Sequence, residues 1–143
     1  MADVTINKSD GKSAWAEVVA DIGGGVNAPQ QARAAQVVTP VSQATAAAFA
    51  DVAGSLLDTL HFGSVSYSIL NTHGANSLDW QVLASNDAAF AAAVIVDGPG
   101  AVAAGVADTY AVAQAPYRYY IVQVQDTAAG DHAAATVVGV AKA

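Results

Sequence analysis

The chain has 143 residues, of which 35 are Ala and 20 are Val, and its formal net charge at pH 7 is −7. Its five Lys and Arg residues are spread over the whole sequence, whereas nucleic-acid binding depends on clustered cations, so we expect no nucleic-acid partner. The chain has no cysteine, which excludes disulfide bonds, thiolate zinc sites and cysteine nucleophiles.

The N-terminal segment is predicted to form an arm over residues 1–35, extended or partly helical, that precedes one domain over residues 36–143. Gly23, Gly24 and Gly25 indicate a hinge rather than a phosphate loop, because no Lys-Ser or Lys-Thr pair follows them. Neither a signal peptide nor a membrane span is visible in the sequence, so we expect no membrane partner. An apolar stripe at helical spacing needs a surface to pack against, and it provides the predicted partner-contact residues Trp15, Val18, Val19 and Ile22.

The segment from Thr45 to Leu60 allows two interpretations. Its apolar residues keep helical spacing, and Thr45 is suited to cap the N-terminus of an amphipathic helix. Gly54 weakens this interpretation, because glycine destabilises helices, and residues 55–60 fit a strand equally well. Both alternatives stay open.

Two segments with alternating side chains follow. Residues 65–70 place apolar side chains at every second position, and so do residues 78–84, which is the pattern of half-buried strands. Residues 71–77 between them contain Gly and Asn, which suit a turn. The pattern therefore predicts a hairpin.

Further strands are predicted in the C-terminal half. Residues 91–96 are an apolar run, predicted as a buried strand that ends at residues 97–100, and alternation predicts a strand over residues 109–114. Residues 117–125 are rich in aromatic and β-branched residues, and the last strand covers residues 133–141. Eleven of the twelve acidic residues are Asp, which favours turns over helices. The predicted fold is all-β: a β-sandwich or jelly roll of six to eight antiparallel strands.

Residues with catalytic or metal-binding potential are scattered along the chain. His61, His73 and His132 are not closely spaced, and the Asp residues lack the spacing of an EF-hand, so solvated loops and capped turns explain them. No G-x-S-x-G motif is present. We therefore expect no catalytic residues, no cofactor, no metal site and no enzymatic activity.

The aromatic residues offer one alternative. Trp80 and the tyrosine-rich residues 117–120 would suit the sugar-stacking platform of a carbohydrate-binding or adhesion module. Trp80 shares its side of the strand with Leu78 and Val82, which favours a position in the core.

Four segments carry a resemblance to a known class of proteins. They comprise strands and the turns that follow them, at Ser64–Thr72, Gly74–Val82, Ala84–Asp87 and Ala115–Val124. On these residues, the chain from about residue 55 to residue 142 resembles β-sandwich virion proteins of tailed phages, similar to head decoration (cement) proteins and to accessory modules of the tail and neck. Proteins of this class have no catalytic residues, so the resemblance transfers none.

The resemblance implies a non-enzymatic phage virion structural protein, a capsid decoration protein that binds the outer capsid surface and stabilises the head. It implies the major capsid protein as partner and a homo-oligomer, with a trimer favoured because three-fold lattice sites are common docking points. The expected location is the capsid exterior of the virion, after synthesis in the host cytoplasm. A tail or neck accessory module is the alternative within virions, and a carbohydrate-binding or adhesion module is the alternative outside them.

Overall fold

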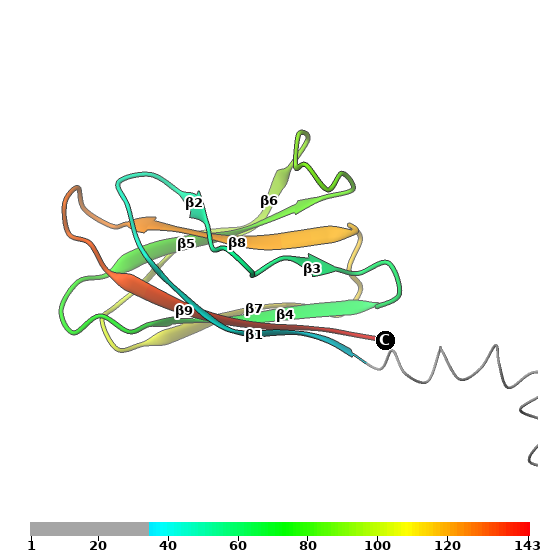
Figure 1. Ribbon diagram of the computed structural model, residues 1–143, viewed down its shortest axis with the longest axis horizontal. Coiled ribbons are helices and arrows are strands. Elements are labelled where there is room, and N and C mark those ends of the chain that lie inside the picture. The colour runs from blue at the N-terminus through cyan, green and yellow to red at the C-terminus, as the bar shows by residue number, and fades with distance from the viewer. Residues whose placement is uncertain (1–34) are drawn as a thin grey trace, which may run out of the picture. The chain divides into compact units, whose positions relative to one another are not determined.

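The computed structural model describes residues 35–143, and within this range it has nine β-strands and no α-helix (Figure 1). The arm predicted over residues 1–35 lies outside the described residues apart from Ala35, and so do its predicted partner contacts Trp15, Val18, Val19 and Ile22. The strands in chain order are β1 (Ala35–Ala44), β2 (Ala50–Asp51), β3 (Leu57–Asp58), β4 (Ser64–Asn71), β5 (Leu78–Ser85), β6 (Val94–Val102), β7 (Ala107–Val112), β8 (Tyr119–Asp126) and β9 (Ala134–Lys142).

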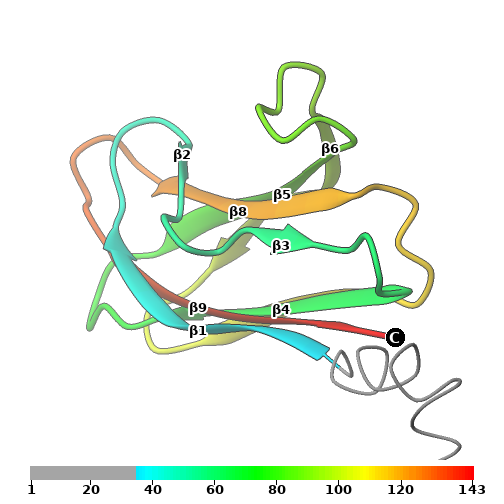
Figure 2. The ribbon, with the colours of Figure 1, turned by 45° about the vertical axis from the view of Figure 1, so that its right-hand side comes forward.

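The strands form two antiparallel sheets. The four-stranded sheet has the order β1-β9-β4-β7, and the five-stranded sheet has the order β2-β8-β5-β6, with β3 also paired to β8. The sheets lie as two layers, with β1, β9 and β4 in one layer and β5 and β8 in the other (Figures 1 and 2). The prediction of an all-β sandwich is confirmed, although two of the nine strands, β2 and β3, have only two residues each.

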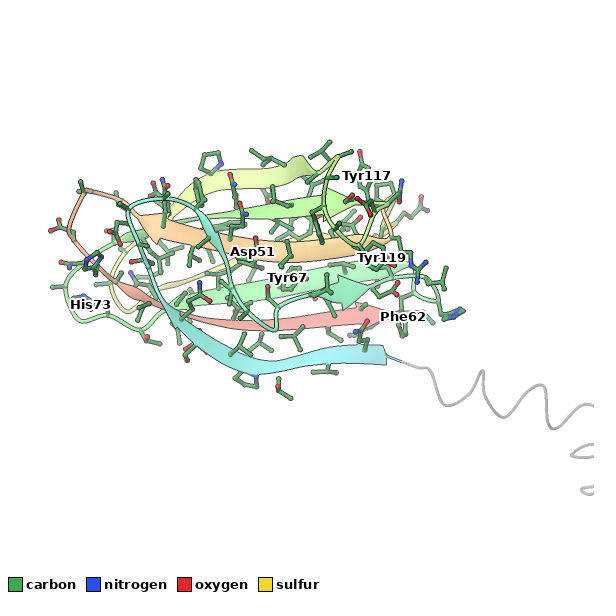
Figure 3. All side chains as sticks on the ribbon, turned by 45° about the horizontal axis from the view of Figure 1, so that its top comes forward. Asp51, Phe62, Tyr67, His73, Tyr117 and Tyr119 are labelled. Carbon is green, nitrogen blue, oxygen red and sulfur yellow. The ribbon has the colours of Figure 1, made fainter. Side chains whose placement is uncertain are left out.

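The core lies between the two sheets and follows from the period of two along each strand. In β4, Val65, Tyr67 and Ile69 are buried, whereas the serines between them are only half-buried. From the opposite layer, β8 contributes Tyr120 and Val122, which are fully buried. Tyr67 therefore lies between the layers (Figure 3).

Gly139 of β9 lets the Tyr67 ring pack directly against the backbone of the neighbouring strand. A methyl group on Gly139 would lie 2.6 Å from Tyr67 Cδ1 and Cε1. The Tyr67 hydroxyl donates to the carbonyl oxygens of Ser55 and Tyr120, at 2.7 and 2.9 Å. Burial raises the pKa of Tyr67 well above its ordinary value, and it raises the pKa of Tyr110 to about 12.

The predicted hairpin between residues 65–70 and 78–84 is wrong. β4 pairs with β7 and β9, whereas β5 pairs with β6 and β8, so the chain crosses from one sheet to the other between them. The fully buried Asn71 fixes this crossing, because its Nδ2 donates to the carbonyl oxygens of Asn76 and Val102 at 2.8 and 3.0 Å. Alternation shows which side of each strand is buried, but both strands face the same core, so it does not distinguish a hairpin from a crossing.

The predicted helix between Thr45 and Leu60 is also wrong, and the strand alternative holds only for the two residues of β3. Val52 and Leu57 are fully buried, but Leu60 is 57% exposed, so the apolar residues do not share one face. Gly54 has a φ of +89°, a left-handed conformation that interrupts regular structure. Thr45 caps no helix.

Strand β6 differs from its prediction in both extent and burial. It begins at Val94 and continues through residues 97–100, which were expected to end it. Val94 and Ile95 are 40% and 53% exposed, so the strand is not buried. β6 is the edge strand of its sheet, where a proline is tolerated because one side of the backbone has no neighbour to bond. This position explains why Pro99 does not stop it.

Candidate interaction surface

The outer face of the four-stranded sheet is the most distinctive surface in the described part of the chain. It is built by the side chains that alternate with the core residues of β1, β9, β4 and β7. The registers align these side chains in rows across the sheet. We call this surface the outer valine-serine face; its members are Val37, Ser42, Ser64, Ser66, Ser68, Leu70, Ala107, Thr109, Ala111, Thr136, Val138, Val140 and Lys142.

The two halves of this face differ in side-chain size. The β1 and β9 half carries Val37, Val138 and Val140, and the β4 and β7 half carries serine, threonine and alanine apart from Leu70 at one end. One row runs Val37, Val140, Ser66, Ala111 across the four strands. A shallow hollow of about 580 Å³ lies over this part of the sheet, with Tyr67 and Gly139 among its lining residues. The valines and the small residues line this hollow together, so the face has larger side chains on one half and mostly smaller ones on the other.

Several of its apolar side chains remain in contact with solvent. Val37 is 61% exposed, and Leu70 and Val138 are both 38% exposed. Single exposed apolar residues are ordinary on protein surfaces, whereas a contiguous group of them marks an interaction site.

Charge is absent from the middle of the outer valine-serine face. Residues 35–143 contain eight Asp and two cationic residues, Arg118 and Lys142. Within the four-stranded sheet the acidic residue is Asp108, which pairs in register with the inward-facing Ile69 and accepts a hydrogen bond from Trp80 Nε1 at 3.1 Å. Lys142 lies at one end of the face, beside Ser64. Apart from Asp108, which is exposed on the edge strand β7, the acidic residues of the described chain belong to the other sheet and the loops.

The outer face of the five-stranded sheet carries an apolar row, Ile95, Leu83 and Ile121, beside polar side chains that bond to one another. Gln81 Nε2 donates to Gln123 Oε1, and Gln123 Nε2 donates to Asp51 Oδ1, both at 2.7 Å. Gln125 Nε2 donates to Asp79 Oδ2 at 3.4 Å. These contacts join β2, β5 and β8 into a polar ladder, so these polar side chains satisfy one another's hydrogen bonds.

Arg118 and Asp58 form an ion pair at one end of the same sheet. Arg118 Nε and Nη2 donate to the two Asp58 oxygens at 3.0 and 2.9 Å. These hydrogen bonds hold the pKa of Asp58 below its ordinary value. The guanidinium carbon also lies 4.8 Å from the centre of the Tyr119 ring.

A cluster of Thr45, Asp126 and His132 was not predicted from the sequence. The Asp126 side chain is fully buried; its Oδ1 accepts a hydrogen bond from the Thr45 hydroxyl, and its Oδ2 lies 2.9 Å from His132 Nδ1. The Thr45 hydroxyl oxygen also accepts from the Ala133 backbone N–H at 2.7 Å. The carboxylate lies between the hydroxyl and the imidazole, so the histidine has no contact through which to activate Thr45 as a nucleophile. The cluster therefore connects the end of β1, the end of β8 and the loop that precedes β9.

The remaining histidines and carboxylates do not assemble a reactive site. His73 Nδ1 accepts backbone N–H groups of Ala75 and Asn76, and His61 is exposed. His73 lies at the opposite end of the sandwich from Phe62 and Tyr117 (Figure 3). Within residues 35–143 no group of three or more His, Cys, Asp or Glu side chains is placed to hold a metal ion.

The aromatic residues do not form the sugar platform considered from the sequence. Trp80 is 3% exposed and Tyr120 is fully buried, which confirms the core position predicted for Trp80. Tyr117 and Tyr119 are half-buried, and Arg118 covers one side of the Tyr119 ring. No helix in the described part of the chain is long and apolar enough to cross a membrane.

The fold is a two-layer antiparallel β-sandwich. No protein-family model matches the chain, and no curated protein matches it. Similar solved structures include a protein of Bacillus endospore appendages, a family of disulfide-linked pili, at 15% identity over 76% of this chain and 86% of that chain, with a TM-score of 0.46. The SPBc2 prophage-derived protein YomS is 13% identical over 73% and 96%, with a TM-score of 0.37. The VP2 subviral particle of infectious bursal disease virus is 11% identical over 76% and 32%, with a TM-score of 0.43.

These likenesses carry no argument about function, because identity and TM-score are both low.

Proposed function

We propose that the protein is a non-enzymatic structural protein of a virion, a decoration protein on the outer surface of a phage capsid. The observation that carries the proposal is the outer valine-serine face, a sheet face with no charge in its middle on a domain with eight Asp residues. Association through such a face removes apolar area from water without desolvating a charge. The resemblance of residues 55–142 to tailed-phage virion proteins supports the same function.

The construction of the sandwich suits a protein that stabilises a particle. Each long strand is paired along its length, and most of the core residues are valine, alanine or tyrosine. A decoration protein acts through many copies on a symmetric lattice, where modest contacts of each copy add up to a large collective effect. Such a protein needs durable packing and complementary surfaces, and it needs no reactive group.

The proposed partner on the particle is the major capsid protein, and the proposed anchor is the N-terminal arm. A short apolar stripe at helical spacing fits a hydrophobic groove, and an extended arm adds a strand to the edge of a partner sheet. The residues proposed to make this contact are Trp15, Val18, Val19 and Ile22.

The test uses capsids that lack the protein. We expect the full-length chain to bind them and to raise their temperature of disassembly, whereas a full-length variant with Trp15, Val18, Val19 and Ile22 replaced by Ser loses most of its occupancy. A matched control replaces two exposed apolar residues of the sandwich, Leu60 and Val106, by Ser and should bind as the unmodified chain does. Undiminished binding of the arm variant would refute the proposal that these four residues anchor the protein to the capsid.

Electron cryomicroscopy of the decorated particles tests the location. Density for the sandwich over the outer capsid surface is the expected result. Density confined to the tail or neck would replace the decoration function by that of an accessory module, and failure of the unmodified chain to bind any part of the particle would refute both.

A further inference from the structure

We infer that the outer valine-serine face is a self-association surface, through which two copies of this chain pack face to face about a two-fold axis. The axis runs parallel to the strands, between β9 and β4. The inference goes beyond the proposed function, because it names which surface joins copies of the chain and in what symmetry.

Charge is the first argument for a second copy as the occupant. Residues 35–143 carry eight Asp and two cationic residues, so two copies repel each other over most approaches. Face-to-face contact through the outer valine-serine face keeps Asp51, Asp58 and Asp79 on the far sides of the pair, since they belong to the five-stranded sheet. This arrangement brings together two copies of a surface whose one charged member, Lys142, lies at its end.

Shape is the second argument, because the face is complementary to itself. Rotation about an axis along the boundary between β9 and β4 places the β1 and β9 half of one copy opposite the β4 and β7 half of the other. The registers Val138↔Ser68 and Val140↔Ser66 then set each valine of one copy opposite the serine of the other copy in the same row. The larger valine side chains of each copy thereby meet the smaller serine and alanine side chains of its partner.

The size of the face sets the expected strength of the pair. Four strands about 4.8 Å apart, with about seven residues each at about 3.4 Å per residue, cover roughly 450 Å² on each copy. Stable complexes bury about 800 Å² per partner, so the pair belongs with weak interfaces that dissociate on dilution. A flat face that meets its own copy closes as a dimer, which differs from the trimer expected from the resemblance.

Sedimentation velocity of the full-length chain over a wide concentration range tests the pair. We expect the mass to rise from one chain to two as concentration increases. Val138→Lys and Ser68→Asp should each keep the sedimenting species at one chain, because each introduces a charge at the centre of the contact. Ala101→Lys, at an exposed position of β6 in the other sheet, is the matched control and should pair as the unmodified chain does.

A mixture of the two single variants gives the sharpest result. Lys at position 138 of one copy would lie opposite Asp at position 68 of the other, so an equimolar mixture of Val138→Lys and Ser68→Asp should recover the two-chain species. Three results would refute the pair: a monomer at all concentrations, a three-chain species, or no recovery in the mixture. Circular dichroism establishes that each variant is folded.

The outcomes also separate the pair from the proposed function. A chain that forms the pair but binds no capsid supports the pair and refutes decoration. A chain that binds capsids but stays monomeric in solution and sits singly on the lattice refutes the pair and supports decoration.

Discussion

The outer faces of the two sheets differ in how their polar residues are used. On the five-stranded sheet, Gln81, Gln123 and Asp51 bond to one another across three strands. On the four-stranded sheet, the outward positions of β4 include Ser66 and Ser68, whose short side chains line a hollow together with the valines of β9. Both faces follow from the same period of two, so alternation alone does not tell a self-satisfied surface from one suited to a partner.

The largest effect is expected beneath the outer valine-serine face. Gly139→Ala places a methyl group 2.6 Å from the Tyr67 ring, whose hydroxyl is bonded in place, so we expect a loss of about 2–3 kcal/mol in the free energy of unfolding. Urea denaturation measures this loss. Gly63→Ala is the control, because a methyl group there meets no atom within 4 Å, and its effect should stay within about 1 kcal/mol. Equal effects of both substitutions would contradict this account.

The next largest effect concerns Tyr67, which is buried between the two sheets. Because the folded-state pKa of Tyr67 is raised above its ordinary value of 10.0, stability is fully present below pH 10 and falls as the pH rises above it. Tyr67→Phe removes the bonded hydroxyl at a cost of about 1–2 kcal/mol at pH 7 and should flatten the alkaline loss. Thermal melts from pH 7 to pH 11 measure both; an unchanged alkaline slope in the variant would show that Tyr67 does not cause it.

A smaller effect compares the two faces directly. Gln123→Ala takes the acceptor from Gln81, which is 7% exposed, and should lower the free energy of unfolding by about 1 kcal/mol. Ser66→Ala on the opposite face should change it by no more than about 0.5 kcal/mol. Chemical denaturation of the two variants at low protein concentration gives the comparison, and a loss at Ser66 as large as that at Gln123 would refute the contrast.

The smallest effect is expected at the Arg118–Asp58 ion pair. Its side chains are 41% and 36% exposed, so solvent screens most of the attraction, and Arg118→Ala should barely shift the melting temperature at neutral pH. Since the pKa of Asp58 is lowered in the folded state, its contribution is present above its ordinary value of 3.8 and is lost as the pH falls through the lowered pKa. A melting difference between the two chains that grows toward acid would have the wrong sign.

The sequence predicted the fold class because each strand of a sandwich is buried on one side, so apolar and polar residues alternate along it. The strand near residues 65–70 and the strong β segment near 117–125 appear as β4 and β8, and Trp80 lies in the core as expected. The same alternation does not show which strands pair with each other. The turn-rich residues 71–77 predicted a hairpin, whereas the buried amide of Asn71 holds a crossing between sheets.

Burial was predicted poorly where a strand lies at an edge. Ile95 belongs to an apolar run that suggested a buried strand, but β6 has a neighbour on one side alone, and Ile95 is 53% exposed. The interaction surface was not predicted at all, because it depends on registers between β1, β9, β4 and β7, which are far apart in the sequence. The predicted contact residues Trp15, Val18, Val19 and Ile22 lie outside the described residues and stay predictions.

The crossing at residues 72–77 has a consequence for how the chain folds. Among the described strands, β5 and β6 are the sole consecutive pair that bond to each other, whereas the long pairings of β1 and β4 are with β9 at the far end of the domain. Loops of many residues must close before those contacts form. The chain therefore loses conformational entropy before the contacts stabilise it. We therefore expect folding on the millisecond-to-second scale, with the β5–β6 ribbon as the earliest local structure and the outer valine-serine face completed only when β9 docks.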